Sequence, residues 1–97
     1  MSAEFLVENR VALPPEMPED QRRRLLEEEY ERARELLGRG VIERIWRIPG
    51  GLRNVGVWRV ADANELHEVL ASLPLAPWLE STVTPLARHP VEADERA

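Results

Sequence analysis

Glu29 is the residue of this sequence whose type and position fit acid–base chemistry best. Between residues 19 and 37, apolar side chains recur with the spacing of an amphipathic helix. At about 100° per residue they fall within an arc of about 140°, and Glu29 falls inside that arc while Glu27 and Glu28 fall outside it. The apolar residues of this arc are Leu25, Leu26, Tyr30, Ala33, Leu36 and Leu37. Because burial raises the pKa of a carboxyl toward neutral pH, we expect Glu29 to be a general acid and base.

A purely structural role for Glu29 predicts a different environment. Its carboxylate would then extend to solvent or pair with an arginine, and its pKa would be ordinary. All thirteen basic residues of the chain are arginine. Schiff-base chemistry by a lysine amine is therefore excluded, and guanidinium groups are the strong carboxylate binders that the chain offers.

The sequence contains no motif that is typical of a metal or nucleotide site. His67 and His89 are the two histidines, cysteine is absent, and their spacing is not that of metal ligands. Gly50 and Gly51 lie in a turn between two strand-like segments, so they do not form a phosphate-binding loop that opens a helix. We therefore expect neither a metal ion nor a nucleotide-binding loop.

Length and composition are typical of one soluble domain. The chain has 97 residues, of which 43% are hydrophobic and 32% charged. No apolar run approaches the roughly 18 residues that a membrane span needs. The formal net charge of −5 disfavours a nucleic-acid partner, because phosphate binding requires a basic surface. We expect a cytoplasmic protein, since the chain has no cysteine and no secretory segment near Met1.

The order of the predicted elements indicates a ferredoxin-like fold of class α+β. Strand patterns cover residues 4–12, 41–48, 52–60 and 79–87, and helices are predicted over 19–37 and from Asp62 onward, with Leu66, Val69, Leu70 and Leu73 on one face. Asp62 and Glu65 form a capping-box pattern at the start of the second helix. The βαββαβ order predicts a four-stranded antiparallel sheet with two helices on one face. We expect a single domain over residues 1–90 and a disordered tail over 91–97.

One face of this sheet would be left without helices, and two tryptophans are predicted to lie on it. Alternation along the strands places Trp46 with Ile48 and Trp58 with Val60, opposite Ile45, Val55 and Val57. Two exposed indoles would present more apolar area than solvent exposure favours. The sequence therefore predicts self-association through this face.

Several segments of the chain resemble the muconolactone Δ-isomerase family in their order and spacing. These are "FLVENRVALPPEM", the "EEE" helix, "WRIPG" followed by Asn54, "ELHEVLASLPLAPWL" and "RHP", and together they cover about residues 4–90. The resemblance implies a ferredoxin-like fold, a ring-like decamer, no cofactor, and conversion of muconolactone to 3-oxoadipate enol-lactone in the β-ketoadipate route of aromatic degradation.

The resemblance also implies roles for individual residues. Glu29 matches the acidic helix position proposed in the family as the acid–base group, and Arg47 matches an anchor for the substrate carboxylate. Asn54, Trp46 and Trp78 are candidates to line the pocket, and Arg53 is a candidate second cation. Around the turn the chain departs from the family pattern: it has Gly51, Leu52 and Arg53 where the family commonly carries a basic residue, tyrosine and alanine, and Glu8 stands where a basic residue is usual.

These departures leave three hypotheses for the function. The first is the isomerase itself, which shifts a C=C bond in an unsaturated lactone. The second is a paralogue with another substrate, such as a chloromuconolactone dehalogenase, in which the same proton abstraction expels chloride. The third is a non-catalytic ferredoxin-like module for oligomerisation or small-ligand binding, in which Glu29 would pair with an arginine.

Overall fold

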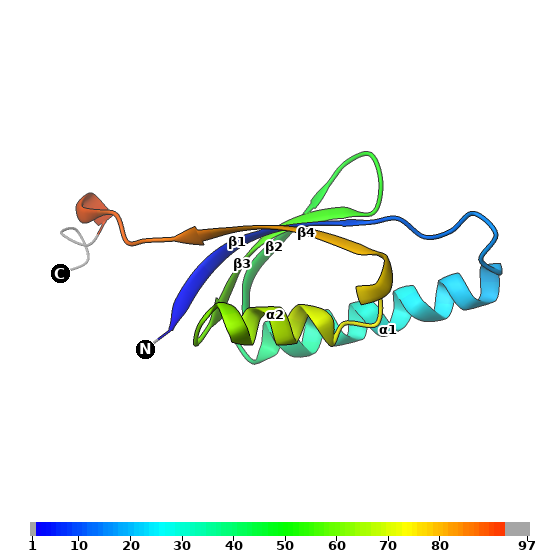
Figure 1. Ribbon diagram of the computed structural model, residues 1–97, viewed down its shortest axis with the longest axis horizontal. Coiled ribbons are helices and arrows are strands. Elements are labelled where there is room, and N and C mark those ends of the chain that lie inside the picture. The colour runs from blue at the N-terminus through cyan, green and yellow to red at the C-terminus, as the bar shows by residue number, and fades with distance from the viewer. Residues whose placement is uncertain (1, 93–97) are drawn as a thin grey trace.

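The computed structural model describes residues 2–92 and has the predicted ferredoxin-like architecture (Figure 1). Its elements follow one another as β1 (Ala3–Val11), α1 (Glu19–Gly38), β2 (Ile42–Ile48), β3 (Arg53–Val60), α2 (Ala63–Ala71), a short 3₁₀ helix η1 (Ala76–Trp78) and β4 (Leu79–Leu86). All strand pairs are antiparallel, and the sheet order is β2-β3-β1-β4. Figure 1 shows α1 and α2 on the same side of the sheet, as the sequence predicts.

Both ends of α1 have local causes in the sequence. Pro18 stands at the N-cap, and Glu19 and Asp20 in the first turn interact favourably with the positive end of the helix dipole. After the last turn, Gly40 has a φ of 78°, a left-handed conformation that glycine adopts without strain. Its N–H donates to the carbonyl of Leu37, which closes the helix and turns the chain into β2.

The predicted capping box of α2 is confirmed. The side chain of Asp62 accepts a hydrogen bond of 2.9 Å from the backbone N–H of Glu65. The carboxylate of Glu65 reaches back to the N–H of Ala61 at 3.3 Å. These bonds satisfy backbone donors that a helix start leaves without partners, so α2 begins where the sequence indicates.

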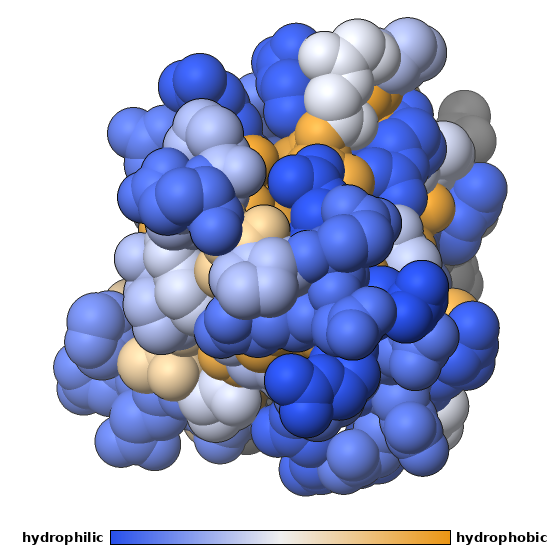
Figure 2. Space-filling model, turned by 90° about the vertical axis from the view of Figure 1, so that its right-hand side faces the viewer, coloured by the Kyte–Doolittle hydropathy of each residue, from blue (hydrophilic) through white to orange (hydrophobic). Residues whose placement is uncertain are grey.

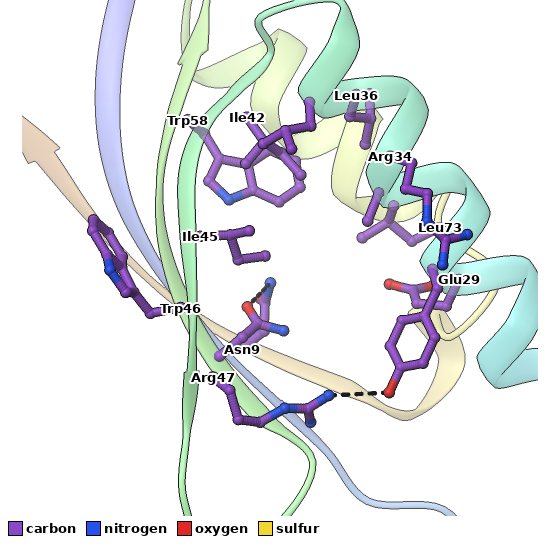
Figure 3. Close-up of a pocket in the computed structure, with 14 residues that line it drawn as sticks. Asn9, Glu29, Arg34, Leu36, Ile42, Ile45, Trp46, Arg47, Trp58 and Leu73 are labelled. Carbon is purple, nitrogen blue, oxygen red and sulfur yellow. Dashed lines mark hydrogen bonds between the residues drawn. The ribbon is translucent and has the colours of Figure 1, made fainter.

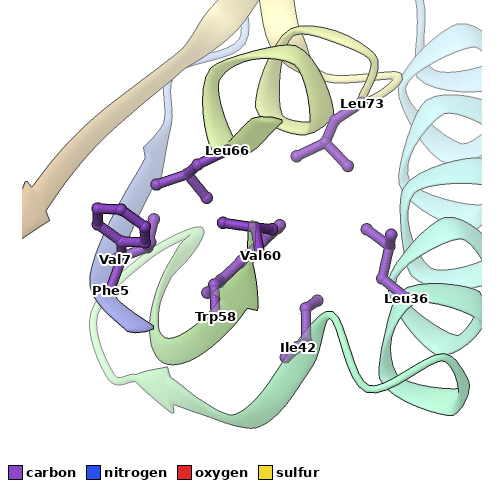
Figure 4. Packing of buried hydrophobic residues seen from close by; sticks show 8 residues of the cluster. All are labelled: Phe5, Val7, Leu36, Ile42, Trp58, Val60, Leu66 and Leu73. Carbon is purple, nitrogen blue, oxygen red and sulfur yellow. The ribbon is translucent and has the colours of Figure 1, made fainter. Parts of the chain in front are cut away.

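The hydrophobic core lies between the sheet and the two helices (Figure 4). Side chains from β1, β2, β3 and both helices contribute to it. The buried residues of this cluster are Phe5, Val7, Leu36, Ile42, Trp58, Val60, Leu66 and Leu73. Along β1 the buried residues alternate with exposed ones, as expected for a strand with one covered face. The core thus fixes the face of the sheet on which a pocket can form.

The prediction that Trp46 and Trp58 share the open face is wrong. Trp58 is 2% exposed and belongs to the core, whereas Trp46 is 44% exposed. The hairpin register pairs Trp46 with Val55 and Ile48 with Arg53. Since directly paired residues lie on one face, Trp46 shares its face with Val55, and Trp58, three residues further on, lies on the other.

An irregularity in β2 explains why Ile42 lies in the core with Trp58. The register shifts between Ile42 and Arg44, so Ile42 pairs with Trp58 while Arg44 pairs with Val57. One extra residue in a strand exchanges the two faces beyond it. Ile42 can therefore enter the core together with Trp58, although plain alternation from Trp46 would place it with Arg44.

One end of the molecule is strongly polar. The end of the molecule seen in Figure 2 is mostly hydrophilic, and apolar residues appear there only between charged and polar side chains. Within residues 2–92, no helix is long and apolar enough to cross a membrane. The tail predicted over 91–97 lies, from residue 93 on, outside the described residues.

Candidate active site

A cavity of about 330 Å³ opens between α1 and the covered face of the sheet (Figure 3). Its walls are largely apolar and include Leu36, Ile42, Ile45, Trp58 and Leu73. Its polar lining residues are Asn9, Glu29, Tyr30, Arg34, Arg47 and Asn54. A small, mostly apolar hollow with a few convergent polar groups is the usual form of a small-molecule site.

Glu29 lies in the wall of this cavity, on the face of α1 that packs toward the sheet. Its side chain is partly buried, while those of Glu27 and Glu28 are exposed. Burial raises the pKa of Glu29, and a hydrogen bond from the backbone N–H of Leu75 to its Oε1, 3.0 Å long, opposes that rise in part. No arginine forms an ion pair with Glu29 among residues 2–92. Glu29 is therefore a partly desolvated carboxyl that is held by a backbone N–H and not by an arginine.

Arg47 extends from β2 to the same cavity and contacts α1. Its Nη2 donates a 3.0 Å hydrogen bond to the hydroxyl of Tyr30, the residue after Glu29 (Figure 3). Among the described residues, no carboxylate lies within ion-pair distance of Arg47. Arg34, one helical turn after Tyr30, also lines the cavity. Two guanidinium groups thus bring positive charge beside a partly buried carboxyl, which suits an anionic ligand.

A polar row crosses three strands of the sheet, and two of its members, Asn9 and Asn54, line the cavity. Asn9 on β1 pairs in register with Asn54 on β3 and with Ser81 on β4. The Ser81 hydroxyl donates to Oδ1 of Asn9 at 2.6 Å, and Nδ2 of Asn9 donates to Oδ1 of Asn54 at 3.4 Å. Asn9 is only 5% exposed, so these bonds provide the partners that a buried amide requires.

The structure brings some of the predicted site residues together and separates others. Glu29, Arg47 and Asn54 line one cavity, as expected for a shared site. Trp46 also borders it, but its indole lies on the opposite side of β2 in Figure 3, where Arg44 stacks on it at 4.8 Å. Trp78 is in η1 and lies outside the lining of this cavity.

Arg53 lies on the other face of the sheet from Glu29. It pairs with Arg10 and Ile48 and borders a polar hollow together with Glu8 and Glu80. A role for Arg53 beside Glu29 therefore has no support from its place in this chain. Its predicted contact with substrate stays a hypothesis.

Sequence reasoning did not select Asn9, Tyr30, Arg34 or Trp58 as site residues. For Asn9 a signal was present: it follows Phe5 and Val7 in strand alternation, so a polar residue stands at an inward position. Arg34 follows Tyr30 by four residues, a spacing that places both on one side of a helix. Trp58 was missed because its strand face was assigned wrongly.

The described part of the chain has no cluster of side chains that could bind a metal ion. Residues 2–92 contain no group of three or more histidine, aspartate or glutamate side chains that could hold a metal ion. The polar groups that line the cavity are the Glu29 carboxyl, the Tyr30 hydroxyl, the guanidinium groups of Arg34 and Arg47, the amides of Asn9 and Asn54, and the indole of Trp58.

The fold is ferredoxin-like, and its cavity between α1 and the sheet combines the partly buried carboxyl of Glu29 with the guanidinium groups of Arg34 and Arg47. Residues 3–92 match the family model described as muconolactone delta-isomerase. The chain belongs to the muconolactone Δ-isomerase family, as the sequence resemblance indicates.

Relatives in this family cover almost the whole chain. The muconolactone Delta-isomerase of Acinetobacter baylyi is 38% identical over 86 residues, which are 89% of this chain and 90% of that protein. The enzyme of the same name from Pseudomonas aeruginosa is 36% identical over 94 residues, which are 95% of this chain and 98% of that protein. A crystal structure of muconolactone isomerase superposes with a TM-score of 0.84 at 36% identity and covers 90% of this chain and 91% of that one.

Proposed function

We propose that this protein is a muconolactone Δ-isomerase, an intramolecular oxidoreductase that shifts the C=C bond of an unsaturated lactone. The observation that carries the proposal is the carboxyl of Glu29, partly buried in the wall of a largely apolar cavity and without an arginine partner in the described chain. Family membership supplies the substrate class, since the relatives named above are muconolactone isomerases.

A single carboxyl is sufficient for the proton transfers of this reaction. Glu29 as carboxylate removes the proton on the γ carbon of the lactone, and the C–H electron pair moves through the C=C bond to the carbonyl oxygen. The resulting dienolate then takes the proton back from Glu29 at the α carbon. The same atoms are present before and after, so no oxidant or reductant is consumed. A raised pKa brings the carboxyl closer to neutral pH, where it can act in both directions.

Arg47 is the residue we assign to the substrate carboxylate. It lines the cavity beside Tyr30 and has no acidic partner among the described residues, so its guanidinium can form a two-pronged contact with a carboxylate. Tyr30 holds the guanidinium from the α1 side, which limits its freedom before ligand binds. Arg34 adds positive charge at the same side of the cavity.

Product analysis separates the isomerase from the dehalogenase alternative. Purified protein is mixed with muconolactone, and the formation of 3-oxoadipate enol-lactone is followed by proton NMR. A parallel sample receives a chlorinated muconolactone, and chloride is measured with an electrode. Isomerisation without chloride release supports the proposal. Chloride release as the faster reaction would instead support the dehalogenase, and no reaction with either lactone would favour the ligand-binding module.

We also propose that the protein is a homo-oligomer, for which the family resemblance implies a decamer. Several large apolar side chains of the sheet are exposed, among them Ile45, Trp46, Val83 and Leu86. Light scattering after size exclusion tests this proposal, since one chain has a mass of 11.1 kDa. A monomeric mass at micromolar concentration would contradict it. A cytoplasmic location stays a prediction from the cysteine-free composition.

A further inference from the structure

The polar row of Asn9, Asn54 and Ser81 ends beside Arg47. Asn54 on β3 pairs in register with Asn9 on one side and with Arg47 of β2 on the other. Residues paired across neighbouring strands point to the same face of the sheet, with Cβ atoms about 4.5–5.5 Å apart. Asn54 and Arg47 are therefore neighbours on the face that packs against the helices, and Figure 3 shows Asn9 and Arg47 on the sheet side of the cavity.

Hydrogen bonds along the row direct the amide of Asn54. The Ser81 hydroxyl donates to Oδ1 of Asn9 at 2.6 Å, and Nδ2 of Asn9 donates to Oδ1 of Asn54 at 3.4 Å. In the sheet, β3 lies between β1 and β2. Because the oxygen and nitrogen of an amide point to different sides, an Asn54 oxygen bonded toward β1 leaves its Nδ2 group toward β2 and the cavity. The row thus presents a donor beside Arg47.

The Nδ2 group of Asn54 is free to bind a ligand. Among residues 2–92, the hydrogen bond of the Asn54 side chain is the one that its oxygen accepts, and the side chain is half-buried. In the same part of the chain, the sealed side-chain polar atom without a partner is Nε1 of Trp58, so Nδ2 of Asn54 keeps accessible surface. Asn54 lines the main cavity and also, with Glu29, Tyr30 and Arg47, an adjoining hollow of about 40 Å³.

We propose that Asn54 shares the substrate carboxylate with Arg47, and that Asn9 and Ser81 are positioning residues for this contact. The inference rests on the proposed function, which supplies a lactone acid as the ligand. Arg47 has no acidic partner among the described residues, and Nδ2 of Asn54 has no acceptor there. Two neighbouring donors of this kind match the two oxygens of a carboxylate.

The direction of the amide decides whether Asn54 helps or hinders. With its oxygen held by Asn9, Asn54 donates to the carboxylate; turned by 180°, it would place its own oxygen beside a negative charge. Asn9 is 5% exposed, so its two ends depend on protein partners. The Ser81 hydroxyl occupies the oxygen of Asn9 and leaves its Nδ2 group for Asn54. Ser81 acts on the ligand through these two amides.

NMR of the side-chain amides tests the contact without any turnover. The saturated analogue of muconolactone has no C=C bond to shift, so this acid binds without reacting, and its saturation is followed by calorimetry. The chain has three asparagines and one glutamine, and the Asn54 amide is assigned through its own backbone. We expect the Asn54 amide protons to move downfield at saturation, while those of Asn64, an exposed residue of α2, stay in place. Asn54 resonances that stay in place at saturation overturn the contact.

Asn54→Asp tests the direction of the amide. Aspartate keeps an oxygen that can accept from Nδ2 of Asn9 and replaces the donor beside Arg47 by a negatively charged oxygen. We expect the affinity for the saturated acid to fall at least about 10-fold, because like charges then meet. The methyl ester of the acid lacks the charge, so its affinity should change much less.

An Asn54→Asp protein that binds the acid as tightly as wild type would overturn the proposal. Circular dichroism and the melting temperature report whether the variant is folded. If it is not, the NMR titration of the wild type decides.

The positioning role of Ser81 has a kinetic signature. Ser81→Ala leaves the oxygen of Asn9 without its donor, so we expect KM for muconolactone to rise about 3- to 10-fold, with a smaller effect on kcat. A carboxylate contact is made alike in the ground state and the transition state, and its loss therefore changes KM more than kcat. Ser81→Thr should restore KM because threonine keeps the hydroxyl.

Thr82→Val is the matched control for Ser81→Ala. Thr82 is the next residue of β4 and pairs with Glu8, so its hydroxyl lies on the other face of the sheet. We expect its KM to stay within twofold of wild type. A KM of Ser81→Ala equal to that of wild type, or a loss that Ser81→Thr does not restore, would overturn the positioning role.

The outcomes distinguish this subsite from the proposed function. If muconolactone is isomerised while the Asn54 resonances do not move at saturation with the acid, the subsite is overturned and the isomerase stands. If muconolactone is not turned over but the acid moves these resonances, the isomerase is overturned and the carboxylate subsite stands. If the acid does not bind and muconolactone is not turned over, both are overturned.

Discussion

The backbone N–H of Leu75 donates a hydrogen bond of 3.0 Å to Oε1 of Glu29, across 46 residues of sequence. This bond joins α1 to the segment between α2 and η1, and it occupies one oxygen of the carboxyl. No hydrogen bond to Oε2 of Glu29 comes from residues 2–92, which leaves that oxygen to exchange a proton with a ligand. The contact thus orients the carboxyl while burial raises its pKa.

The pH dependence of stability follows from the raised pKa of Glu29. Between its ordinary pKa of about 4.5 and the raised value in the folded protein, the folded state binds more protons than the unfolded state. The contribution of Glu29 to stability is therefore fully present below the ordinary value and is lost as the pH rises through the raised pKa. We expect the melting temperature of wild type, relative to Glu29→Gln, to fall over this window. Calorimetry of both proteins from pH 4 to 8 measures the difference, and a constant difference would contradict the raised pKa.

The same pKa governs the acid limb of the rate profile. Glu29 must be ionised to remove the γ proton, so kcat/KM for muconolactone should rise with pH through the pKa of Glu29 in the free protein. The midpoint should lie above about 4.5, the ordinary glutamate value. An acid limb at or below the ordinary value would show that the reacting carboxyl is not desolvated.

Substitution of Arg47 and Arg53 distinguishes two candidate anchors for the substrate carboxylate. Arg47 lines the cavity of Glu29, whereas Arg53 is outside its lining and pairs in register with Arg10, on the other face of the sheet from Asn9 and Asn54. We expect Arg47→Met to raise KM for muconolactone about 10- to 100-fold, the usual effect of losing a charge-assisted hydrogen bond. Arg53→Met should change KM much less. A larger effect at Arg53 would mean that its face of the sheet takes part in binding.

Gly56 tests the packing of β2 against β3. A Cβ at this position would lie 2.6 Å from the carbonyl oxygen of Arg44, a backbone atom that cannot move without the strand. We expect Gly56→Ala to lower the free energy of unfolding by about 1–3 kcal/mol. Gly38→Ala is the matched control, because a Cβ there meets nothing within 4 Å, and we expect a change of at most about 1 kcal/mol. Urea denaturation measures both, and equal stability of the two variants would contradict the close approach.

Local patterns in the sequence are sufficient to predict the helices and strands and the partial burial of Glu29. The helical period singles out Glu29 from Glu27 and Glu28 because it depends only on residues within α1, and the structure buries that side chain in part. Asp62 and Glu65 likewise locate the start of α2, because a helix cap is a contact between near neighbours.

Contacts that depend on strand register could not be predicted in the same way. The faces of Trp46 and Trp58 are decided by the hairpin pairing and by the shift between Ile42 and Arg44, and one residue of slip exchanges them. The bond from Leu75 to Glu29 depends on how a loop packs against a distant helix. The polar row of Asn9, Asn54 and Ser81 forms only after three strands are in register.

The measurement that tests the central claim most directly is the turnover of muconolactone by wild type, Glu29→Gln and Glu28→Gln. Glutamine keeps an oxygen that can accept from Leu75 but cannot act as a base, and Glu28 is an exposed neighbour on the same helix. The account predicts that Glu29→Gln lowers kcat by about 10²- to 10⁴-fold while Glu28→Gln remains within twofold of wild type. A Glu29→Gln protein as fast as wild type would contradict the assignment of Glu29 as the acid–base group.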